Sequence, residues 1–242
     1  MPIQSPVYGR CGRIGLIVPA NNSVIEPEFW SVLPSGVAAY ATRVMAKGDL
    51  TVEAVKRMEA DVNSAVAAIA ATGVDVIAYC DMVTTFIMEV GWNEDAVERI
   101  SASARIPALS AWTALRDALS FLGVRRFALG TPYPRAIHAL ARPFFKHRGY
   151  EVHADATLDI VAMRDVPAVG AERLSAFIAT LDTQTCDAIV LLATDLPTFG
   201  CLAELEAKFQ LPILTSNQTL LWSALRVLKQ RPAKPLGRLF ER

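Results

Sequence analysis

The chain lacks most of the features that identify a function at sight. No hydrophobic run reaches the roughly 18 residues that a membrane helix requires, because Pro, Asp or Arg interrupts each of them. Residues 1–5 carry neither the basic nor the apolar block of a signal peptide. Lysine and arginine number 24, aspartate and glutamate also 24, so there is no net charge to favour nucleic acid. We therefore expect neither a membrane nor a nucleic acid as partner.

Cysteine and histidine are also scarce. The four cysteines are scattered without Cys-x-x-Cys spacing, which favours a reduced, cytoplasmic protein. His138, His147 and His153 fall on one predicted helix and the strand after it, with spacing unsuited to a shared metal ion. We expect ordinary surface histidines and no metal site.

Three common catalytic motifs are missing. No GxGxxG follows the first predicted strand, no GxxxxGK[ST] occurs, and no GxSxG elbow is present. These absences argue against a dinucleotide site, a phosphate-binding P-loop and a serine hydrolase of that type. The remaining possibilities are an enzyme that uses its own side chains without a cofactor and a protein that binds a small molecule.

Short apolar runs alternate with helical patterns. Apolar residues recur every three or four positions from Val52 to Ile69, which predicts one amphipathic helix, capped by Thr51 and ended at Gly73. Further helices are expected at 134–148, 171–181 and 217–229, and strands at 13–18, 74–80, 126–130, 187–193 and 211–215. Such alternation, in a chain that is 52% hydrophobic, predicts an α/β fold with parallel sheets and a large core.

The chain repeats itself at an offset of 105 to 113 residues. The matching pairs are 13–19 with 126–132, 75–81 with 187–193, and 106–110 with 211–215. Because the matches keep their order, we predict two similar α/β halves that face each other across a cleft. Ligands bind such sheets beyond the carboxyl ends of the strands. The loops there are rich in Asn, Thr, Ser and Tyr, which predicts a polar pocket with little fixed charge.

Three segments resemble one known superfamily. They are Gly15–Asn22 (GLIVPANN), Asp75–Tyr79 (DVIAY) and Gly123–Tyr133 (GVRRFALGTPY), and the closing Pro235–Glu241 (PLGRLFE) adds a fourth. The chain resembles the aspartate/glutamate racemase superfamily, and within it the arylmalonate decarboxylase and maleate cis-trans isomerase branch.

The resemblance implies two pseudo-symmetric α/β halves, each a parallel sheet flanked by helices, with the active site in the cleft between them. The first half would comprise 1–115 and the returning C-terminal helix in 217–242, and the second half 116–216. It also implies a small carboxylate substrate and no cofactor. Members typically use two cysteines, one after the middle strand of each half, to move a proton at the carbon beside a carboxylate.

Both cysteine positions differ here. The first falls on Asp81, with Cys80 one place earlier, and the second falls on Ala193 in Leu192–Asp195 (LATD). Neighbouring side chains in a strand point to opposite faces, so Cys80 reaches the cleft only if a bulge turns it. Asp195 we interpret as structural.

Other positions match the family better. The resemblance implies that Asn22 and Tyr133 bind a substrate carboxylate. Thr194 keeps the hydroxyl residue that the family has at this position, and Val166 implies an apolar wall of the active site. The candidate catalytic residues are thus Asp81, Tyr133 and Cys80, and the candidate binding residues Pro19, Asn21, Asn22, Thr131, Val166, Ala193 and Thr194.

Asp81 is the one ionisable side chain at a family catalytic position, and the resemblance makes it the candidate acid/base. Burial beside apolar neighbours would raise its pKa from about 4 toward neutrality. Capping the following helix is an alternative role. Isomerase or decarboxylase chemistry is favoured over amino-acid racemisation, which needs two acid/base groups. The alternatives are a hydratase or hydrolase of a small cyclic or unsaturated acid, or a non-catalytic carboxylate-binding homologue. The high apolar content is compatible with a homo-oligomer.

Overall fold

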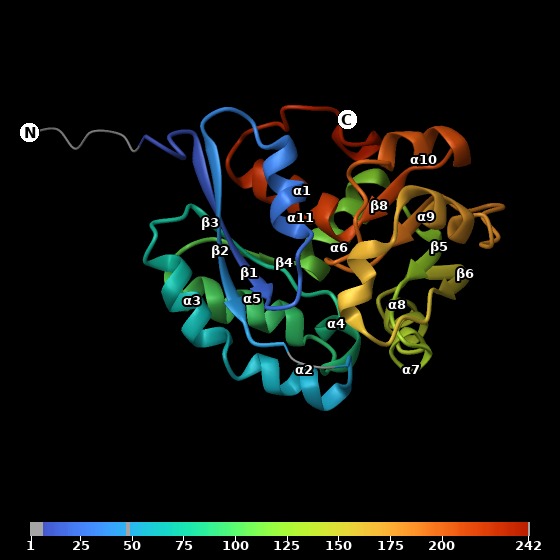
Figure 1. Ribbon diagram of the computed structural model, residues 1–242, viewed down its shortest axis with the longest axis horizontal. Coiled ribbons are helices and arrows are strands. Elements are labelled where there is room, and N and C mark those ends of the chain that lie inside the picture. The colour runs from blue at the N-terminus through green and yellow to red at the C-terminus, as the bar shows by residue number, and fades with distance from the viewer. Residues whose placement is uncertain (1–6, 47–48, 242) are drawn as a thin grey trace, which may run out of the picture.

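The computed structural model describes residues 7–46 and 49–241, and in them two four-stranded parallel sheets (Figure 1). The first sheet has the order β2-β1-β3-β4 and the second the order β6-β5-β7-β8. The strands are β1 (Gly12–Pro19), β2 (Val37–Val44), β3 (Val76–Tyr79), β4 (Ala108–Ser110), β5 (Arg126–Thr131), β6 (Glu151–Thr157), β7 (Ala188–Leu191) and β8 (Ile213–Thr215). Every pairing is parallel.

This architecture confirms the two pseudo-symmetric halves. The repeated segments become β1 and β5, β3 and β7, and β4 and β8, which hold the same places in their sheets. The edge strand β2 was not predicted, because most of its side chains are only half-buried and no continuous apolar run marks it.

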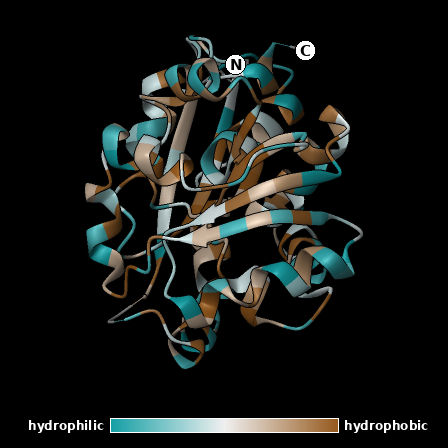
Figure 2. Ribbon diagram, turned by 90° about the vertical axis from the view of Figure 1, so that its right-hand side faces the viewer, coloured by the Kyte–Doolittle hydropathy of each residue, from teal (hydrophilic) through white to brown (hydrophobic). Residues whose placement is uncertain are grey.

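Helices surround both sheets, and in Figure 2 hydrophilic and hydrophobic residues alternate along the outer ones, as expected where a helix buries one face. They are α1 (Ile25–Val32), α2 (Val52–Glu59), α3 (Val62–Ala70), α4 (Thr84–Ile87), α5 (Trp92–Ala104), α6 (Ala111–Leu122), α7 (Arg135–His138), α8 (Ala141–His147), α9 (Ala171–Ile178), α10 (Leu202–Phe209) and α11 (Ser216–Val227), with 3₁₀ turns η1 (Met163–Ala168) and η2 (Arg238–Phe240). None of these described helices has the length and apolar character needed to cross a membrane.

Two predicted helices are each divided in two. The helix expected over 52–69 breaks between α2 and α3, where the Ala60 and Asp61 amides bond back three residues instead of four. The helix expected over 134–148 breaks between α7 and α8 in the same way, through the Leu140 amide and the Ile137 carbonyl. Apolar periodicity continues across such 3₁₀ turns, so it does not reveal them.

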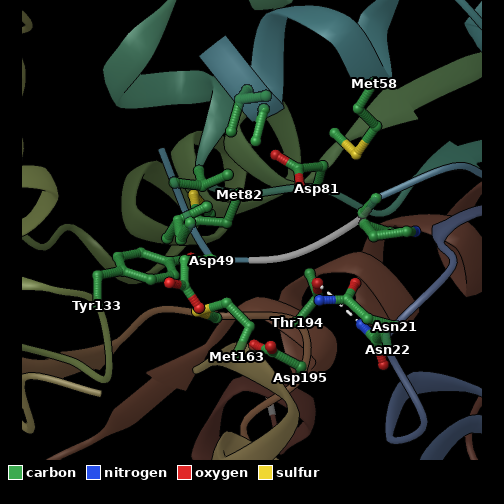
Figure 3. A pocket seen from close by; sticks show the side chains of 16 residues that line it. Asn21, Asn22, Asp49, Met58, Asp81, Met82, Tyr133, Met163, Thr194 and Asp195 are labelled. Atoms are coloured by element: carbon green, nitrogen blue, oxygen red, sulfur yellow. Dashed lines mark hydrogen bonds between the residues drawn. The ribbon is translucent and has the colours of Figure 1, made fainter. Parts of the chain in front are cut away.

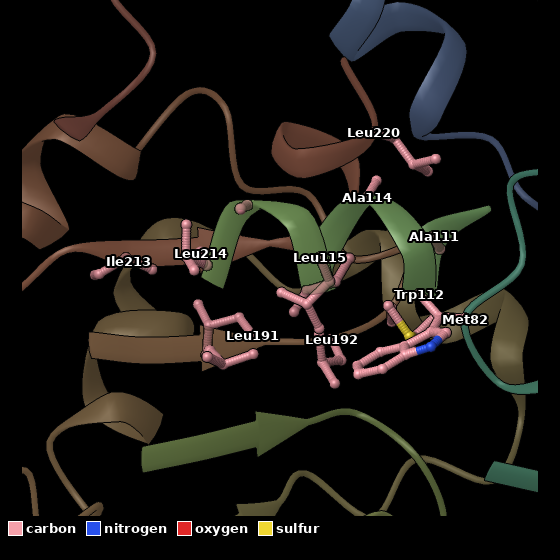
Figure 4. Packing of buried hydrophobic residues seen from close by; sticks show 14 of the residues in the cluster. Met82, Ala111, Trp112, Ala114, Leu115, Leu191, Leu192, Ile213, Leu214 and Leu220 are labelled. Atoms are coloured by element: carbon pink, nitrogen blue, oxygen red, sulfur yellow. The ribbon is translucent and has the colours of Figure 1, made fainter. Parts of the chain in front are cut away.

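One hydrophobic core serves both halves. Helix α6 packs between the sheets, beside β8 and α11 (Figure 4). Trp112 at its start is fully buried, and its ring meets Phe144 of α8 edge-on with centroids 4.7 Å apart. Helix α11 contacts α1, β3 and β4 as well as β8, so the C-terminal helix reaches elements of both sheets. The division of the chain at residues 115 and 216 stays a prediction.

Replacing Trp112 tests how far the shared core depends on one side chain. We expect Trp112→Ala to lower the free energy of unfolding by about 3–5 kcal/mol, because it leaves a large cavity among aromatic rings. Trp30 on α1 is 59% exposed, and Trp30→Ala should change that free energy by less than about 0.5 kcal/mol. Urea unfolding compares the two variants with the wild type, and equal effects would contradict the assignment of Trp112 to the core.

Candidate active site

A pocket lies between the two halves, beyond the carboxyl ends of the central strands. A cavity of about 60 Å³ forms part of a hollow of about 570 Å³ that opens to solvent. Figure 3 labels much of its lining: Asn21, Asn22, Asp49, Met58, Asp81, Met82, Tyr133, Met163, Thr194 and Asp195. The lining joins residues far apart in the chain, as expected where a ligand site is shared by two similar halves.

Asn22 ties the two halves together at the pocket. Its side-chain oxygen accepts hydrogen bonds from the amides of Val24 (2.9 Å) and Ile25 (3.2 Å) at the start of α1. Its side-chain nitrogen donates to Oγ1 of Thr194 (3.0 Å), and that hydroxyl donates in turn to the Cys80 carbonyl (3.0 Å). The loops after β1, β3 and β7 are therefore held to one another.

Arg43 of β2 supports the same loop from behind. Its Nη1 donates to the carbonyl oxygens of Asn22 (2.6 Å) and Pro19 (3.3 Å), and its Nη2 pairs with Glu26. Pro19, Asn21 and Asn22 all line the pocket as the sequence predicts, on a loop whose backbone is fixed.

Asp81 lies in the pocket directly beyond β3. Its Oδ1 accepts a hydrogen bond from the Thr84 amide (2.8 Å) at the start of α4, so it both caps that turn and lines the pocket. Burial raises the pKa of the Asp81 carboxyl to about 6, against the opposing effect of hydrogen bonds from Thr84 and Val83. Near neutral pH this carboxyl is therefore able to give or take a proton.

Asp195 is a second buried carboxyl in the pocket, and the sequence interpretation of it as structural missed this position. The residue is 8% exposed and lies in the loop after β7. Burial raises the pKa of its carboxyl to about 7, its own amide lowers it, and the charge of Asp81 raises it further. The sequence signal that could have identified Asp195 is its acidic side chain in the loop after a predicted strand of the second half.

Tyr133 contributes a hydrogen-bond donor. It lies beyond β5, and its ring packs edge-on against Phe86 with centroids 6.4 Å apart. Burial, and then the charges of Asp195 and Asp81, hold the pKa of its phenol well above the ordinary value. The hydroxyl therefore keeps its proton at every ordinary pH.

The structure does not bring Cys80 into the pocket. The side chain is fully buried in the core, where Sγ lies 3.2 Å from the Ala78 carbonyl. Burial raises the pKa of its thiol, which disfavours a thiolate. The chain leaves β3 without the bulge that was needed, so Cys80 and Asp81 point to opposite sides.

Three more predicted binding residues lie outside the pocket lining. Thr131 is fully buried, and its hydroxyl lies 2.9 Å from Nδ1 of His138. Val166 on η1 packs in the core, and Met163 of the same turn lines the pocket instead. The Ala193 amide donates to Oγ of Ser216 (3.1 Å), whereas the neighbouring Thr194 lines the pocket.

His138 corrects the expectation of surface histidines. It is buried, and its Nε2 lies 3.0 Å from Oδ2 of Asp155. Together with its contact to Thr131, this makes it part of an internal polar chain, while His147 is exposed. Within residues 7–46 and 49–241, no three His, Cys, Asp or Glu side chains are grouped to hold a metal ion.

An apolar wall completes the pocket. It consists of Ala46, Leu50, Ala54, Val55 and Met58, most of them from α2. Sequence periodicity places Val55 and Met58 on the buried face of a helix but does not say which cavity that face meets.

The buried carboxyl of Asp195 has a measurable effect on stability. A raised pKa means that the folded state holds the proton more tightly, so stability is present at pH 4 and is lost as the pH rises through about 7. Between pH 4 and pH 8 the wild type should lose on the order of 3 kcal/mol of unfolding free energy that the Asp195→Asn variant does not lose. Urea titrations over that range measure it.

The control is Asp165→Asn, which removes an exposed carboxyl on η1. Because that carboxyl is exposed to solvent, this variant should not show the difference from wild type expected of Asp195→Asn. An Asp195→Asn variant whose difference from wild type does not change with pH would contradict the burial argument.

Comparison with known proteins identifies relatives over nearly the whole chain. Residues 14–240 match the family model described as arylmalonate decarboxylase. A maleate isomerase of Nocardia farcinica is 27% identical over 237 residues, covering 94% of each chain. An arylmalonate decarboxylase of Bordetella bronchiseptica is 23% identical over 237 residues, covering 94% of this chain and 96% of the relative.

Solved structures agree with this assignment. The maleate isomerase Iso from Pseudomonas putida S16 is 26% identical, with a TM-score of 0.90 over 95% of this chain and 98% of its own. A Cys-to-Ser variant of the Nocardia farcinica maleate cis-trans isomerase, with a covalently bound succinylcysteine intermediate, has a TM-score of 0.88 at 25% identity over 95% and 98% of the two chains. The chain therefore belongs to the arylmalonate decarboxylase family, an enzyme family whose matched members are isomerases and decarboxylases.

Proposed function

We propose that this protein is an isomerase or decarboxylase that acts at the carbon beside the carboxylate of a small acid, with Asp81 as an acid/base. One observation carries the proposal: a buried carboxyl with a pKa of about 6 lies at the carboxyl end of a central strand, in a pocket with hydrogen-bond donors. Membership of a family of isomerases and decarboxylases supports the reaction class, and the composition of the pocket supports proton transfer.

The pocket contains hydrogen-bond donors that suit a carboxylate. Removing a proton or carbon dioxide beside a carboxylate leaves an electron pair that spreads onto the carboxylate oxygens. The protonated hydroxyl of Tyr133 and the second amide hydrogen of Asn22, whose first goes to Thr194, are free to donate to those oxygens. Fixed donors in a buried site stabilise such an anion strongly.

Asp81 moves the proton. As a carboxylate it takes the proton from the carbon, whose bonding electrons pass into the carboxylate group. As a carboxylic acid it returns a proton to the same carbon, or to the carbon that has lost carbon dioxide. A pKa near 6 keeps both forms populated close to neutral pH, which suits a general acid/base.

The pocket favours proton transfer over addition of a thiolate. Succinylcysteine is the intermediate bound in the Nocardia farcinica variant. Among the described residues that line this pocket there is no cysteine, and Cys80 faces the core. We therefore propose a reaction carried out by carboxyl groups. We also propose a cytoplasmic location, because four free cysteines are typical of a reducing compartment.

Replacing Asp81 tests the assignment. Proton NMR in heavy water, with maleate, an arylmalonate, aspartate, glutamate and a hydantoin as substrates, should show deuterium uptake, isomerisation or loss of carbon dioxide for at least one of them. We expect Asp81→Asn to lower that rate by about 10²- to 10⁴-fold while the acid still binds.

Asp165→Asn again serves as the matched control and should keep the wild-type rate. Undiminished turnover by Asp81→Asn would remove Asp81 from the mechanism. Binding of acids by the wild type, with no deuterium uptake, isomerisation or loss of carbon dioxide for any of them, would instead identify a carboxylate-binding protein.

A further inference from the structure

We propose that Asp195 is a second acid/base that faces Asp81 across the substrate, so that the enzyme moves protons with one carboxyl from each half. This inference rests on the proposed function and narrows it to isomerisation by two groups. It also removes the argument against two-base chemistry, which rested on Asp81 being the one acid/base available.

The repeat places the two carboxyls in corresponding loops, although not at the same position within them. Asp81 lies two residues beyond β3 and Asp195 four residues beyond β7, and these strands hold the same place in their sheets. Both side chains line the pocket, and in Figure 3 they project from opposite walls, one above and one below Thr194. A substrate carbon between them would be open to one carboxyl on each face.

The surroundings of Asp195 do not fit a structural role. Glu28 on α1 shows what a structural carboxyl in this protein looks like: it is 9% exposed and accepts hydrogen bonds from the amides of Thr198 (2.5 Å) and Phe199 (2.8 Å) and from Nδ2 of Asn217 (2.7 Å). Asp195 is buried to the same degree, yet within the described residues no side chain and no backbone group of another residue donates to its carboxyl.

Burial of a carboxyl with few hydrogen-bond donors destabilises a fold. Because the Asp195 side chain lines a pocket that opens to solvent, a ligand can reach it and supply donors. Tyr133 is the parallel case, since its buried hydroxyl also lines the pocket and has no hydrogen-bond partner in the described part of the chain.

Burial, with a smaller contribution from the charge of Asp81, gives the two carboxyls different proton occupancies. The pKa of Asp195, about 7, lies above that of Asp81, about 6, and the charge of Asp81 contributes to the difference. Between these values one group is mostly ionised and the other mostly protonated, as a base and an acid must be. The other titratable groups among the described lining are Tyr133, which stays protonated, and Asp49, which is exposed. Glu59 at the end of α2 lies outside the lining, but burial and the charge of Asp81 raise its pKa to about 7, so the loss of the falling limb of the pH profile in Asp195→Asn is what separates the two groups.

The proton steps balance without a further reactant. The Asp81 carboxylate takes a proton from the carbon beside the substrate carboxylate, and the C–H electron pair passes into that carboxylate group. The Asp195 carboxylic acid then gives its proton to the opposite face, and the electron pair returns to form the new C–H bond. Asp81 ends protonated and Asp195 ionised, and exchange with water or the reverse reaction restores the starting state.

The test uses the full chain and whichever acid of the heavy-water panel the wild type processes. The pH dependence of kcat/KM should be bell-shaped, rising as Asp81 ionises near pH 6 and falling as Asp195 ionises near pH 7. Asp195→Asn should lose the falling limb and lower net isomerisation by about 10²-fold or more. It should nevertheless keep Asp81-dependent exchange of the substrate proton with deuterium.

Asp195→Glu keeps the acid and should recover part of the isomerisation, whereas Asp165→Asn should change neither limb. A structural role would move neither the falling limb nor the ratio of exchange to isomerisation. If Asp195→Asn keeps the bell-shaped profile and the wild-type ratio, the second acid/base is overturned while the proposed function stands. If the wild type shows no deuterium uptake, isomerisation or loss of carbon dioxide with any acid, both are overturned.

Discussion

The pocket depends on the hydrogen-bond chain that runs from Asn22 through Thr194 to the Cys80 carbonyl. It joins loops from three strands and both halves in a buried place, where breaking one bond would leave unpaired polar groups. The remaining oxygen of the Asn22 amide is used to begin α1, so that helix and pocket share one anchor. Loops from the two separate sheets are thereby joined at the pocket.

The buried carboxyls differ in the groups that donate hydrogen bonds to them. Glu28 accepts hydrogen bonds that join α1 to the loop beyond β7, although burial still raises its pKa. Asp81 accepts hydrogen bonds at the start of α4 and Asp195 accepts one from its own amide, and burial raises the pKa of both. A fold tolerates such cost where a reaction needs a group that changes its protonation state near neutral pH.

The thiol of Cys80 and the carboxyl of Asp81 also differ in their surroundings. Cys80 is one residue from Asp81, yet strand alternation turns it into the apolar core, and its thiol is held neutral there. A carboxyl thus stands where the family pattern places its first cysteine, which fits the proton transfer that we propose.

The sequence by itself determined the paired α/β halves, because buried parallel strands are short apolar runs and the repeat preserves their order. It also indicated the loops that hold Asn22, Asp81 and Tyr133, since ligand loops follow strand ends. Only the tertiary structure decided which side of β3 faces the cleft. It also showed that Thr131 lies against His138 and does not line the pocket, and that α2 supplies an apolar wall of the pocket. It alone shows Asp195 opposite Asp81, because burial and the loss of hydrogen-bond partners arise only when the two halves close on one another.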